Sequence, residues 1–197
     1  MVSVHGLVNI VWQKDNDALK TRLLEIIAEK SYQEGKIILS SGKESNYYID
    51  GKLTSLDPEG GTIISVLFLR MLKENVSAVG GLTMGADPLA SGVSQIGYLL
   101  GRDIDAFYVR KEPKAHGTSK WIEGPVTKGL SAAILEDVST TGGSSIKAIY
   151  KAIEFGLKVE QVLAVVDRNE GSREALKKEG IEYNFIFDIN EVIERAK

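Results

Sequence analysis

The stretch Leu135-Glu136-Asp137-Val138-Ser139-Thr140-Thr141-Gly142-Gly143-Ser144 decides how the fold of this chain is interpreted. An apolar run ends at Leu135, two adjacent carboxylates follow, and a loop rich in hydroxyl groups and glycine then opens a helix. Glycines let a backbone approach its ligand, hydroxyls donate hydrogen bonds, and the positive end of the helix dipole favours an anion. The stretch therefore predicts a phosphate cradle between a strand and a helix.

The carboxylates of Glu136 and Asp137 need a different partner, because they would repel a phosphate. Ribose hydroxyls or a hydrated Mg²⁺ suit them. An ordinary capped helix start is the equally weighted alternative, since Ser, Thr and Asp are common at that position. The chain contains no Walker-type lysine motif and no G-x-G-x-x-G, which counts against nucleoside triphosphatases and dinucleotide-dependent enzymes.

Strand-like and helix-like segments alternate on both sides of this stretch. Apolar periodicity predicts strands at 78–81, 104–109, 131–135, 159–166 and 183–187. It predicts helices at 17–30, 58–74, 89–100, 144–155 and 172–179, and two short β-like runs at 36–39 and 46–49 around a turn. This order implies an α/β fold with a central parallel sheet flanked by helices on both faces. Ligands of such sheets bind at the carboxyl ends of the strands.

A cationic loop follows the strand that ends at Val109. Its sequence is Arg110-Lys111-Glu112-Pro113-Lys114-Ala115-His116-Gly117-Thr118-Ser119-Lys120, with four cations, one of the chain's two histidines and a single acid. Charge runs usually lie on a solvated face, but this chain is acidic as a whole, with 24 Lys and Arg against 27 Asp and Glu. A cationic lid over a polyphosphate explains the cluster better, because closure excludes water and strengthens each ion pair.

Two further strand ends carry polar groups. Val162-Leu163-Ala164-Val165-Val166-Asp167-Arg168 is a buried strand that ends in an acid and an arginine, whose planar fork suits a carboxylate or a pair of carbonyls. A surface salt bridge is the alternative for this arginine. Gly80-Gly81-Leu82-Thr83-Met84-Gly85-Ala86-Asp87-Pro88 is another strand-to-helix loop, whose free backbone amides form either a second anion site or a tight connection.

Composition narrows the class of protein. A length of 197 residues and a hydrophobic content of 43% suit one globular domain. The formal charge of −3 counts against nucleic-acid and membrane-surface binding, and the absence of cysteine excludes disulfides and thiolate chemistry. Residues 1–13 lack the features of a signal peptide, and no uncharged run is long enough to span a bilayer. We expect a soluble, cytoplasmic protein, with 1–14 as an arm packed on its own domain or on a partner subunit.

Together these segments resemble the type I phosphoribosyltransferases, and within that family the branch that uses orotate. The Glu136–Ser144 stretch resembles the family's phosphoribosyl pyrophosphate motif. Three further pieces are similar to the orotate branch: Leu39-Ser40-Ser41-Gly42-Lys43-Glu44-Ser45-Asn46-Tyr47-Tyr48-Ile49-Asp50, the loop Arg110-Lys111…Lys114…His116-Gly117, and the position of Arg168. The resemblance runs from about Leu19 to the last predicted strand and rests on the combination of these pieces.

The resemblance implies transfer of the phosphoribosyl group of 5-phosphoribosyl 1-pyrophosphate to orotate, which gives orotidine 5′-monophosphate and pyrophosphate in de novo pyrimidine biosynthesis. It implies one domain over residues 1–197, in which 1–50 form an N-terminal arm and a small hood over the base site. It also implies a homodimer whose loop reaches the neighbouring subunit's site, and Mg²⁺ held by substrate oxygens and water with no direct protein ligand. The implied catalytic residues are Lys111, Lys114 and His116.

The resemblance assigns binding residues as well. Ribose hydroxyls are assigned to Glu136 and Asp137, and the 5′-phosphate to 140–144. The residues assigned to the phosphoribosyl donor as a whole are Arg110, Lys111, Lys114, His116, Glu136, Asp137, Val138, Ser139, Thr140, Thr141, Gly142, Gly143 and Ser144. Those assigned to orotate are Thr140, Arg168, Tyr47 and Tyr48. The pyrophosphate is assigned to backbone amides of 81–87, because some relatives have lysines where this chain has Ser40 and Gly85, and Met84 and Ala86 also depart from the family's pattern.

Two other functions stay open. A phosphoribosyltransferase for a purine or for uracil would share the 136–144 motif, but not the 110–117 loop or the 41–50 segment. A regulator that senses phosphoribosyl pyrophosphate would need an element that reads nucleic acid, and the N-terminal arm shows neither a helix-turn-helix nor a basic stripe. The implied chemistry needs no nucleophile, because positioning and stabilisation of the departing negative charge suffice.

Overall fold

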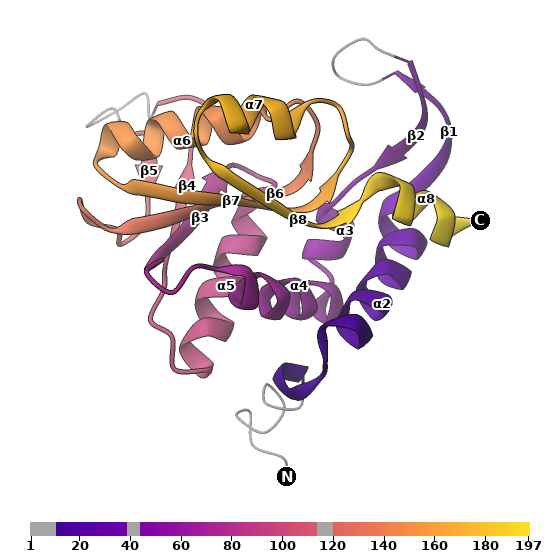
Figure 1. The fold of residues 1–197 in the computed structure, drawn as a ribbon, viewed down its shortest axis with the longest axis horizontal. Coiled ribbons are helices and arrows are strands. Elements are labelled where there is room, and N and C mark those ends of the chain that lie inside the picture. Colours follow the sequence, from indigo (N-terminus) through magenta and orange to yellow (C-terminus); the bar gives the residue numbers. More distant parts are fainter. Residues whose placement is uncertain (1–10, 39–43, 114–119) are drawn as a thin grey trace.

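A six-stranded sheet forms the centre of the protein in our computed structural model, which describes residues 11–38, 44–113 and 120–197 (Figure 1). Its strands are β3 (Ala78–Leu82), β4 (Asp105–Val109), β5 (Ile122–Glu123), β6 (Ser131–Ser139), β7 (Lys158–Asp167) and β8 (Glu182–Asp188). The strand order is β5-β4-β3-β6-β7-β8. All neighbours pair in parallel except β4 and β5, which pair antiparallel. The structure confirms the predicted α/β fold with a central, mostly parallel sheet.

Helices cover both faces of this sheet (Figure 1). One face carries α4 (Pro58–Met71) and α5 (Ala86–Leu99), and the other carries α6 (Gly143–Phe155) and α7 (Ser172–Lys178). Successive side chains of a strand point to opposite faces, and the core divides accordingly. Leu135 packs with residues of α4 and α5, whereas the adjacent Ile134 packs with residues of α6. Burial on both faces explains why the central strands are continuous apolar runs.

The N-terminal segment stands beside the carboxyl ends of the central strands (Figure 1). It consists of α2 (Asn16–Ile26), the π-helical turn η1 (Ile27–Ser31), β1 (Tyr32–Ile38), β2 (Glu44–Ile49) and the short helix α3 (Lys52–Ser55). β1 and β2 form an antiparallel two-stranded sheet of their own. The last helix, α8 (Ile189–Ala196), lies against this segment, and its Arg195 pairs with Glu25 of α2 at 2.8 Å.

Element bounds differ from the predicted ones where tertiary contacts extend or stop an element. β6 does not end at Leu135 but runs through the two carboxylates to Ser139, because β7 pairs with it as far as Ser139 and Asp167. The helix predicted at 58–74 ends at Met71, where Leu72 turns into an extended conformation and buries its side chain. β5, α3 and α8 have no predicted counterpart, since each is too short for a periodic pattern to be distinctive.

The described end of the N-terminal arm packs on its own chain. The guanidinium of Arg70 lies 4.9 Å from the centre of the Trp12 ring. Arg70 also donates hydrogen bonds to the backbone oxygens of Trp12 and Lys14. Packing on its own domain, one of the two alternatives for the arm, therefore holds at Trp12; residues 1–10 lie outside the described residues.

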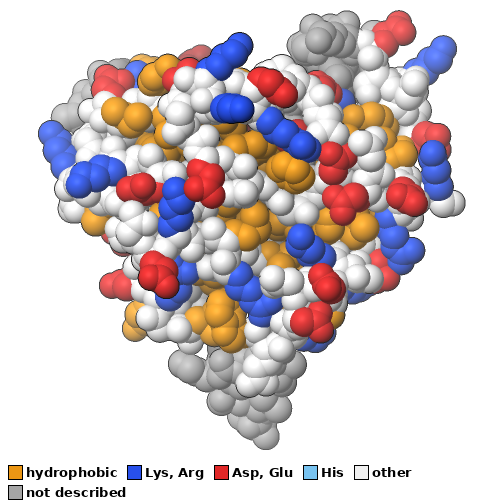
Figure 2. Space-filling view, in the orientation of Figure 1, with side chains coloured by type: hydrophobic (Ala, Val, Ile, Leu, Met, Phe, Trp, Pro, Cys, Tyr) orange, Lys and Arg blue, Asp and Glu red, His pale blue; other side chains and the backbone are white. Residues whose placement is uncertain are grey.

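Charges of both signs mix on the surface. On the face drawn in Figure 2, Lys and Arg side chains of the described residues alternate with Asp and Glu. This mixture agrees with the small formal charge of −3. Among the helices that the structure describes, none combines the length and the apolar character needed to cross a bilayer.

Candidate active site

Four segments meet at the carboxyl ends of β3 and β6 around a cavity of about 300 Å³. It is lined by Lys52, Leu82, Thr83, Met84, Gly85, Lys111, Glu136, Asp137 and Ser144. The structure thus brings together loops that follow three strands, as expected for a parallel sheet. Another hollow, beside Arg173 and Tyr183, has a volume of about 460 Å³. Converging charged groups rather than volume therefore mark the first cavity as the candidate site.

Glu136 and Asp137 are adjacent in sequence, and both line this cavity. Burial, followed by the negative charge of Asp137, raises the pKa of Glu136 to about 8, and a hydrogen bond from Ser145 Oγ at 2.9 Å offsets part of the rise. Burial also raises the pKa of Asp137, although the Val138 amide and the Lys52 ammonium favour its charged form. Carboxyl groups held in this way favour a partner that brings positive charge or hydroxyl hydrogens.

Glycines on two sides let the backbone close on Asp137. A Cβ atom at Gly51 would lie 2.8 Å from the Cβ of Asp137, and one at Gly85 would lie 2.5 Å from its Oδ1 atom. Both distances are well below van der Waals contact. A lysine at position 85, which the resemblance leads one to expect, does not fit while Asp137 keeps its place. A side chain at position 85 would therefore require the carboxyl group of Asp137 to shift.

The loop between β6 and α6 presents bare backbone amides. Gly142, which precedes α6, has a φ of +80°, a left-handed conformation that favours glycine. No side chain caps the helix, so its first amides keep their hydrogens for another acceptor. Thr141, Gly143 and Ser144 are exposed around them. The alternative of an ordinary side-chain cap is therefore wrong here, and the geometry suits an anion.

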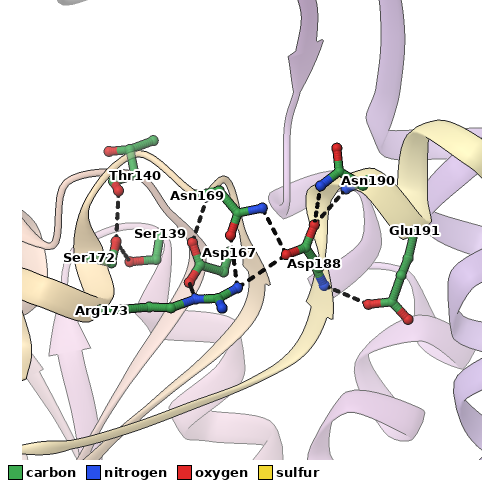
Figure 3. A network of polar contacts seen from close by, with 9 residues as sticks. All are labelled: Ser139, Thr140, Asp167, Asn169, Ser172, Arg173, Asp188, Asn190 and Glu191. Carbon is green, nitrogen blue, oxygen red and sulfur yellow. Dashed lines mark hydrogen bonds and ion pairs between the residues drawn. The ribbon is translucent and has the colours of Figure 1, made fainter.

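Buried hydroxyls tie this loop to α7 (Figure 3). Ser172 donates from Oγ to the backbone oxygen of Thr140 at 2.7 Å, and the Oγ atoms of Ser172 and Ser139 lie 2.7 Å apart. Because a hydroxyl has one hydrogen, Ser139 is the donor in that pair. Both serines are buried. Their bonds therefore hold the peptide of Thr140, where the loop begins, without competition from water.

An ionic network holds the end of β7 (Figure 3). Asp167 is fully buried and accepts hydrogen bonds from Arg173 Nε at 3.0 Å and from the Asn169 amide at 2.7 Å. Arg173 also donates to the Asn169 side chain at 2.8 Å and to Asp188, at the end of β8, at 3.1 Å. The residues on both sides of Arg168 are thus fixed, which determines where the Arg168 side chain can point.

Arg168 is buried at the carboxyl end of β7, with 7% of its surface exposed. Its backbone amide donates to the oxygen of Ser139 at 2.9 Å, which joins it to the end of β6. Its guanidinium pairs with Glu170 at 2.9 Å and lies 4.9 Å from the centre of the Tyr47 ring. Among the described residues, no acceptor meets its Nε–H. Arg168 does form an ion pair, but its side chain is buried. The alternative of a surface salt bridge is therefore wrong for Arg168.

The predicted residues Tyr47, Tyr48, Thr140 and Val138 are not among those that line the cavity. Tyr47 lies over Arg168, whereas the adjacent Tyr48 points to the opposite side of β2 and is 37% exposed. Thr140 is half-buried at the start of the loop. Val138 packs against the hydrophobic core, and its backbone amide donates a hydrogen bond to Asp137 at 2.9 Å.

The cationic segment after β4 is described only in part. Lys111 lines the cavity, and its backbone oxygen accepts a hydrogen bond from Lys147 Nζ at 2.8 Å. Arg110 pairs with Glu123 at 3.4 Å and is not among the residues that line the cavity. Lys114 and His116 lie outside the described residues.

Lys52 lines the cavity and is not among the site residues predicted from the sequence. Its ammonium pairs with Asp50 at 2.6 Å, and it follows Gly51, whose backbone lies against Asp137. A signal was present in the sequence, because Lys52 comes two residues after Asp50, the last residue of the segment similar to the orotate branch. In the sequence alone, a lysine two residues after an acid is indistinguishable from one half of an ordinary surface ion pair.

Comparisons with known proteins give relatives along most of the chain. No protein-family model matches it. The chain is 39% identical over 182 residues to the orotate phosphoribosyltransferase of Nostoc sp., covering 92% of this chain and 88% of that protein. It is 44% identical over 176 residues to the orotate phosphoribosyltransferase of Aquifex aeolicus, covering 89% and 93%. The solved structure of the Mycobacterium tuberculosis orotate phosphoribosyltransferase in complex with 5-phospho-α-D-ribosyl 1-diphosphate superposes with a TM-score of 0.75 at 34% identity, covering 88% and 98% of the two chains.

Proposed function

The chain belongs to the orotate phosphoribosyltransferase family, and from this premise we propose that it is a pentosyltransferase that transfers the phosphoribosyl group of 5-phosphoribosyl 1-pyrophosphate to orotate. The products are orotidine 5′-monophosphate and pyrophosphate, in pyrimidine biosynthesis. The junction of two strand ends carries the proposal: the bare amides after β6 lie next to the buried Arg168 after β7, joined by the bond from the Arg168 amide to Ser139. One side suits a phosphate and the other an anionic base.

The donor extends along the cavity from the β6–α6 loop to the loop after β3. The backbone amides of 140–144 bind its 5′-phosphate, and the carboxyl groups of Glu136 and Asp137 bind its ribose hydroxyls. Its pyrophosphate is bound by the backbone of 81–87 and by the cations after β4, which are Arg110, Lys111, Lys114 and His116. Arg110 can reach it because its pair with Glu123 is long, at 3.4 Å, with both side chains 41% exposed, and exposed pairs of this kind hold weakly.

Orotate lies at the end of β7, under the hood of residues 1–50. The Nε–H of Arg168 and its planar fork suit the carboxylate or the ring carbonyls of orotate. Tyr47, with its ring beside that guanidinium, offers a flat surface for the base, and Thr140 offers a hydroxyl. Tyr48, on the other side of β2, contributes at the rim of the base site.

The chemistry needs positioning more than a reactive side chain. Breaking the bond between the anomeric carbon and pyrophosphate develops positive charge on the ribose and negative charge on the leaving group. Orotate arrives as an anion, so no strong general base is needed. The cations near the pyrophosphate stabilise the departing charge, and the carboxyl groups of Glu136 and Asp137 orient the ribose.

Mg²⁺ is the metal that we assign to the reaction, and when bound it neutralises charge on the pyrophosphate. The residues present fit it, because carboxylate oxygens such as those of Glu136 and Asp137 are the kind of acceptor that Mg²⁺ and its water ligands prefer. In the part of the chain that the structure describes, no three His, Asp or Glu side chains group closely enough to hold a metal. In this proposal, oxygens of the substrates and water would supply its ligands. Both substrates are small charged metabolites, and we place the reaction in the cytoplasm.

One assay tests the assignment of the base. Purified protein is mixed with Mg²⁺, 5-phosphoribosyl 1-pyrophosphate and one of orotate, uracil, hypoxanthine or adenine, and consumption of the base is followed by absorbance. Orotate should be consumed and the other bases should not, because only orotate brings a carboxylate to Arg168. Comparable turnover of uracil or a purine would replace orotate with another base, and no turnover with retained binding of the donor would favour a sensor of that compound.

A homodimer completes the proposal. Leu53, Leu56 and Met84 are apolar yet 48%, 69% and 66% exposed. Met84 lines the cavity, and the two leucines lie on and just after α3, next to Lys52. Exposed apolar side chains around a site mark a surface that another protein covers. We assign it to a second copy of the chain, whose segment after β4 reaches into this site.

Mixed dimers test the sharing of that segment. Lys114→Ala removes a cation of the segment, and Thr141→Asp places a repelling carboxylate beside the 5′-phosphate. Each variant alone should be inactive, and activity should partly return when the two are refolded together, because one site then has both halves intact. If activity stays absent in mixed dimers that mass spectrometry has verified, the segment serves its own chain.

A further inference from the structure

We propose that Lys52 is a substrate-binding residue whose ammonium group contacts the pyrophosphate of the donor, beside the loop that follows β3. This inference rests on the proposed function and adds a residue to it. The cavity position of Lys52, its fixed orientation and the packing at Gly85 are the three observations behind it.

Lys52 is held in place from within the hood. Its ammonium and its backbone amide both meet Oδ1 of Asp50, at 2.6 and 3.1 Å. Asp50 is itself anchored, because its amide donates to the backbone oxygen of Ser31 at 3.0 Å. A lysine whose head group is already ordered loses less conformational entropy when it binds a ligand. Lys52 therefore offers a preorganised cation at the edge of the cavity.

The negative charges in and around the cavity favour a cation at this position. Glu136 and Asp137 are acidic, and the donor would bring the additional negative charge of its pyrophosphate. Among the described residues that line the cavity, Lys52 and Lys111 are the basic ones. The hydrogen bond that Lys52 donates to Asp50, with the nearby charges of Asp50 and Asp137, raises the pKa of Lys52, so it remains an ammonium group throughout the neutral pH range.

The packing around Asp137 brings Lys52 close to the loop after β3. The part of this loop that lines the cavity, 82–85, has no basic side chain, so a cation beside it comes from another segment. The backbones of Gly85 and Gly51 both lie close to Asp137, since a Cβ atom at Gly85 would lie 2.5 Å from its Oδ1 and one at Gly51 would lie 2.8 Å from its Cβ. The close approach of Gly51 brings the next residue, Lys52, to the same cavity.

Four variants test the proposal, with inorganic pyrophosphate plus Mg²⁺ as the binding probe. Lys52→Met removes the charge, Lys52→Gln removes it but keeps a hydrogen-bond donor for Asp50, and Lys52→Arg keeps the charge. Lys73→Met is the matched control, because Lys73 also pairs with an acid, Glu182 at 2.9 Å, and is 38% exposed against 37% for Lys52, but it does not line the cavity. Calorimetry measures pyrophosphate binding, steady-state kinetics measure KM for donor and orotate separately, and urea unfolding measures stability.

Loss of the charge should weaken pyrophosphate binding and raise KM for the donor by about ten- to a hundredfold, with KM for orotate changed by less than about twofold. Lys52→Arg should keep most of the binding, and Lys73→Met should keep all of it. Unchanged pyrophosphate binding in Lys52→Met or Lys52→Gln would overturn the proposal. An equal loss of pyrophosphate binding in Lys52→Arg would also overturn it. The same holds if both uncharged variants unfold while Lys52→Arg folds, because Lys52 would then stabilise the N-terminal segment instead of binding the donor. Pyrophosphate binding needs no turnover, so a failure of the unaltered protein to use orotate would remove the proposed function and leave the role of Lys52 to be decided by binding.

Discussion

The ends of β6 and β7 lie side by side, yet they are built by different means. After β6, the loop that begins at Thr140 offers backbone amides around Gly142, and no side chain caps the helix that follows. After β7, the same place is filled by charged side chains, with Asp167 fully buried and Arg168 almost so. A backbone site depends on space and on the absence of repelling charge, whereas a side-chain site depends on each partner in its network.

This difference predicts opposite responses to mutation. The end of β6 should tolerate loss of an exposed side chain but not the addition of a bulky or negative one. The end of β7 should tolerate neither loss nor replacement, because each charged group there compensates another in a buried position. Four experiments test the contrast, starting with the largest expected effect.

Thr141→Asp should lower kcat/KM for the donor by roughly three orders of magnitude, because a carboxylate about 4 Å from the 5′-phosphate costs about 4 kcal/mol at an effective dielectric constant of about 20. Thr141→Ala, which only removes a hydroxyl, should cost less than about tenfold. Steady-state kinetics with varied donor measure both. Similar losses in the two variants would mean that the side chain, and not the backbone, binds the phosphate.

Arg168→Ala should lower kcat/KM for orotate by about ten- to a hundredfold or slightly more, since losing a charged hydrogen-bond partner costs about 1.5–3 kcal/mol. KM for the donor should stay nearly constant. Arg168→Lys keeps the charge without the planar fork and should recover only part of the loss. Parallel losses for orotate and donor in Arg168→Ala would contradict a separate base site at the end of β7.

Arg173→Ala should reduce the free energy of unfolding by about 1–2 kcal/mol, because it leaves the buried Asp167 with fewer partners, although the exposure of Arg173 weakens the effect. KM for orotate should also rise, because the network positions Arg168. Arg195→Ala is a matched control: Arg195 is 49% exposed against 48% for Arg173, but its partner Glu25 is 34% exposed whereas Asp167 is 0% exposed. Urea unfolding measures the free energy of unfolding of both variants. Equal losses of this free energy would show that the burial of Asp167 has no energetic consequence.

The fourth experiment concerns the carboxyl group of Glu136 and a change in stability per pH unit. Burial raises its pKa from 4.5 to about 8 in the folded, ligand-free protein. Between these values the folded state binds more protons than the unfolded state, so stability should fall as pH rises from about 5 to 8, by at most about 1.4 kcal/mol per pH unit. Glu136→Gln has no proton to lose, and its stability should fall less over this range. Urea unfolding at pH 5, 6, 7 and 8 measures both slopes, and identical slopes would contradict a raised pKa at Glu136.

Much of the fold could be predicted because its signals are local. The apolar runs at 131–135 and 159–166, the glycines at 142 and 143, and the cations after Val109 are recognisable within a few residues of one another. A parallel sheet then places the loops after its strands at one edge. The bounds were less predictable: β6 continues through Glu136 and Asp137 only because β7 pairs with it there.

Part of the site depends on residues far apart in sequence. Arg168 follows a strand in the pattern of a surface salt bridge, and only the tertiary structure shows that it is buried against Tyr47, more than a hundred residues earlier. The network of Asp167, Arg173 and Asp188 has no pattern in the sequence, because it joins the ends of two strands.

The sequence by itself thus determined the alternation of strands and helices, the loop rich in hydroxyl groups and glycine after β6, and the resemblance to a family, since propensity, periodicity and turn chemistry act between near neighbours. Only the tertiary structure decided which charges are buried, that Gly85 lies against the carboxyl group of Asp137 and that Lys52 lines the same cavity as Asp137. Burial and distance are set when segments separated by many residues pack together, and both the pKa of a carboxyl group and the strength of an ion pair depend on them.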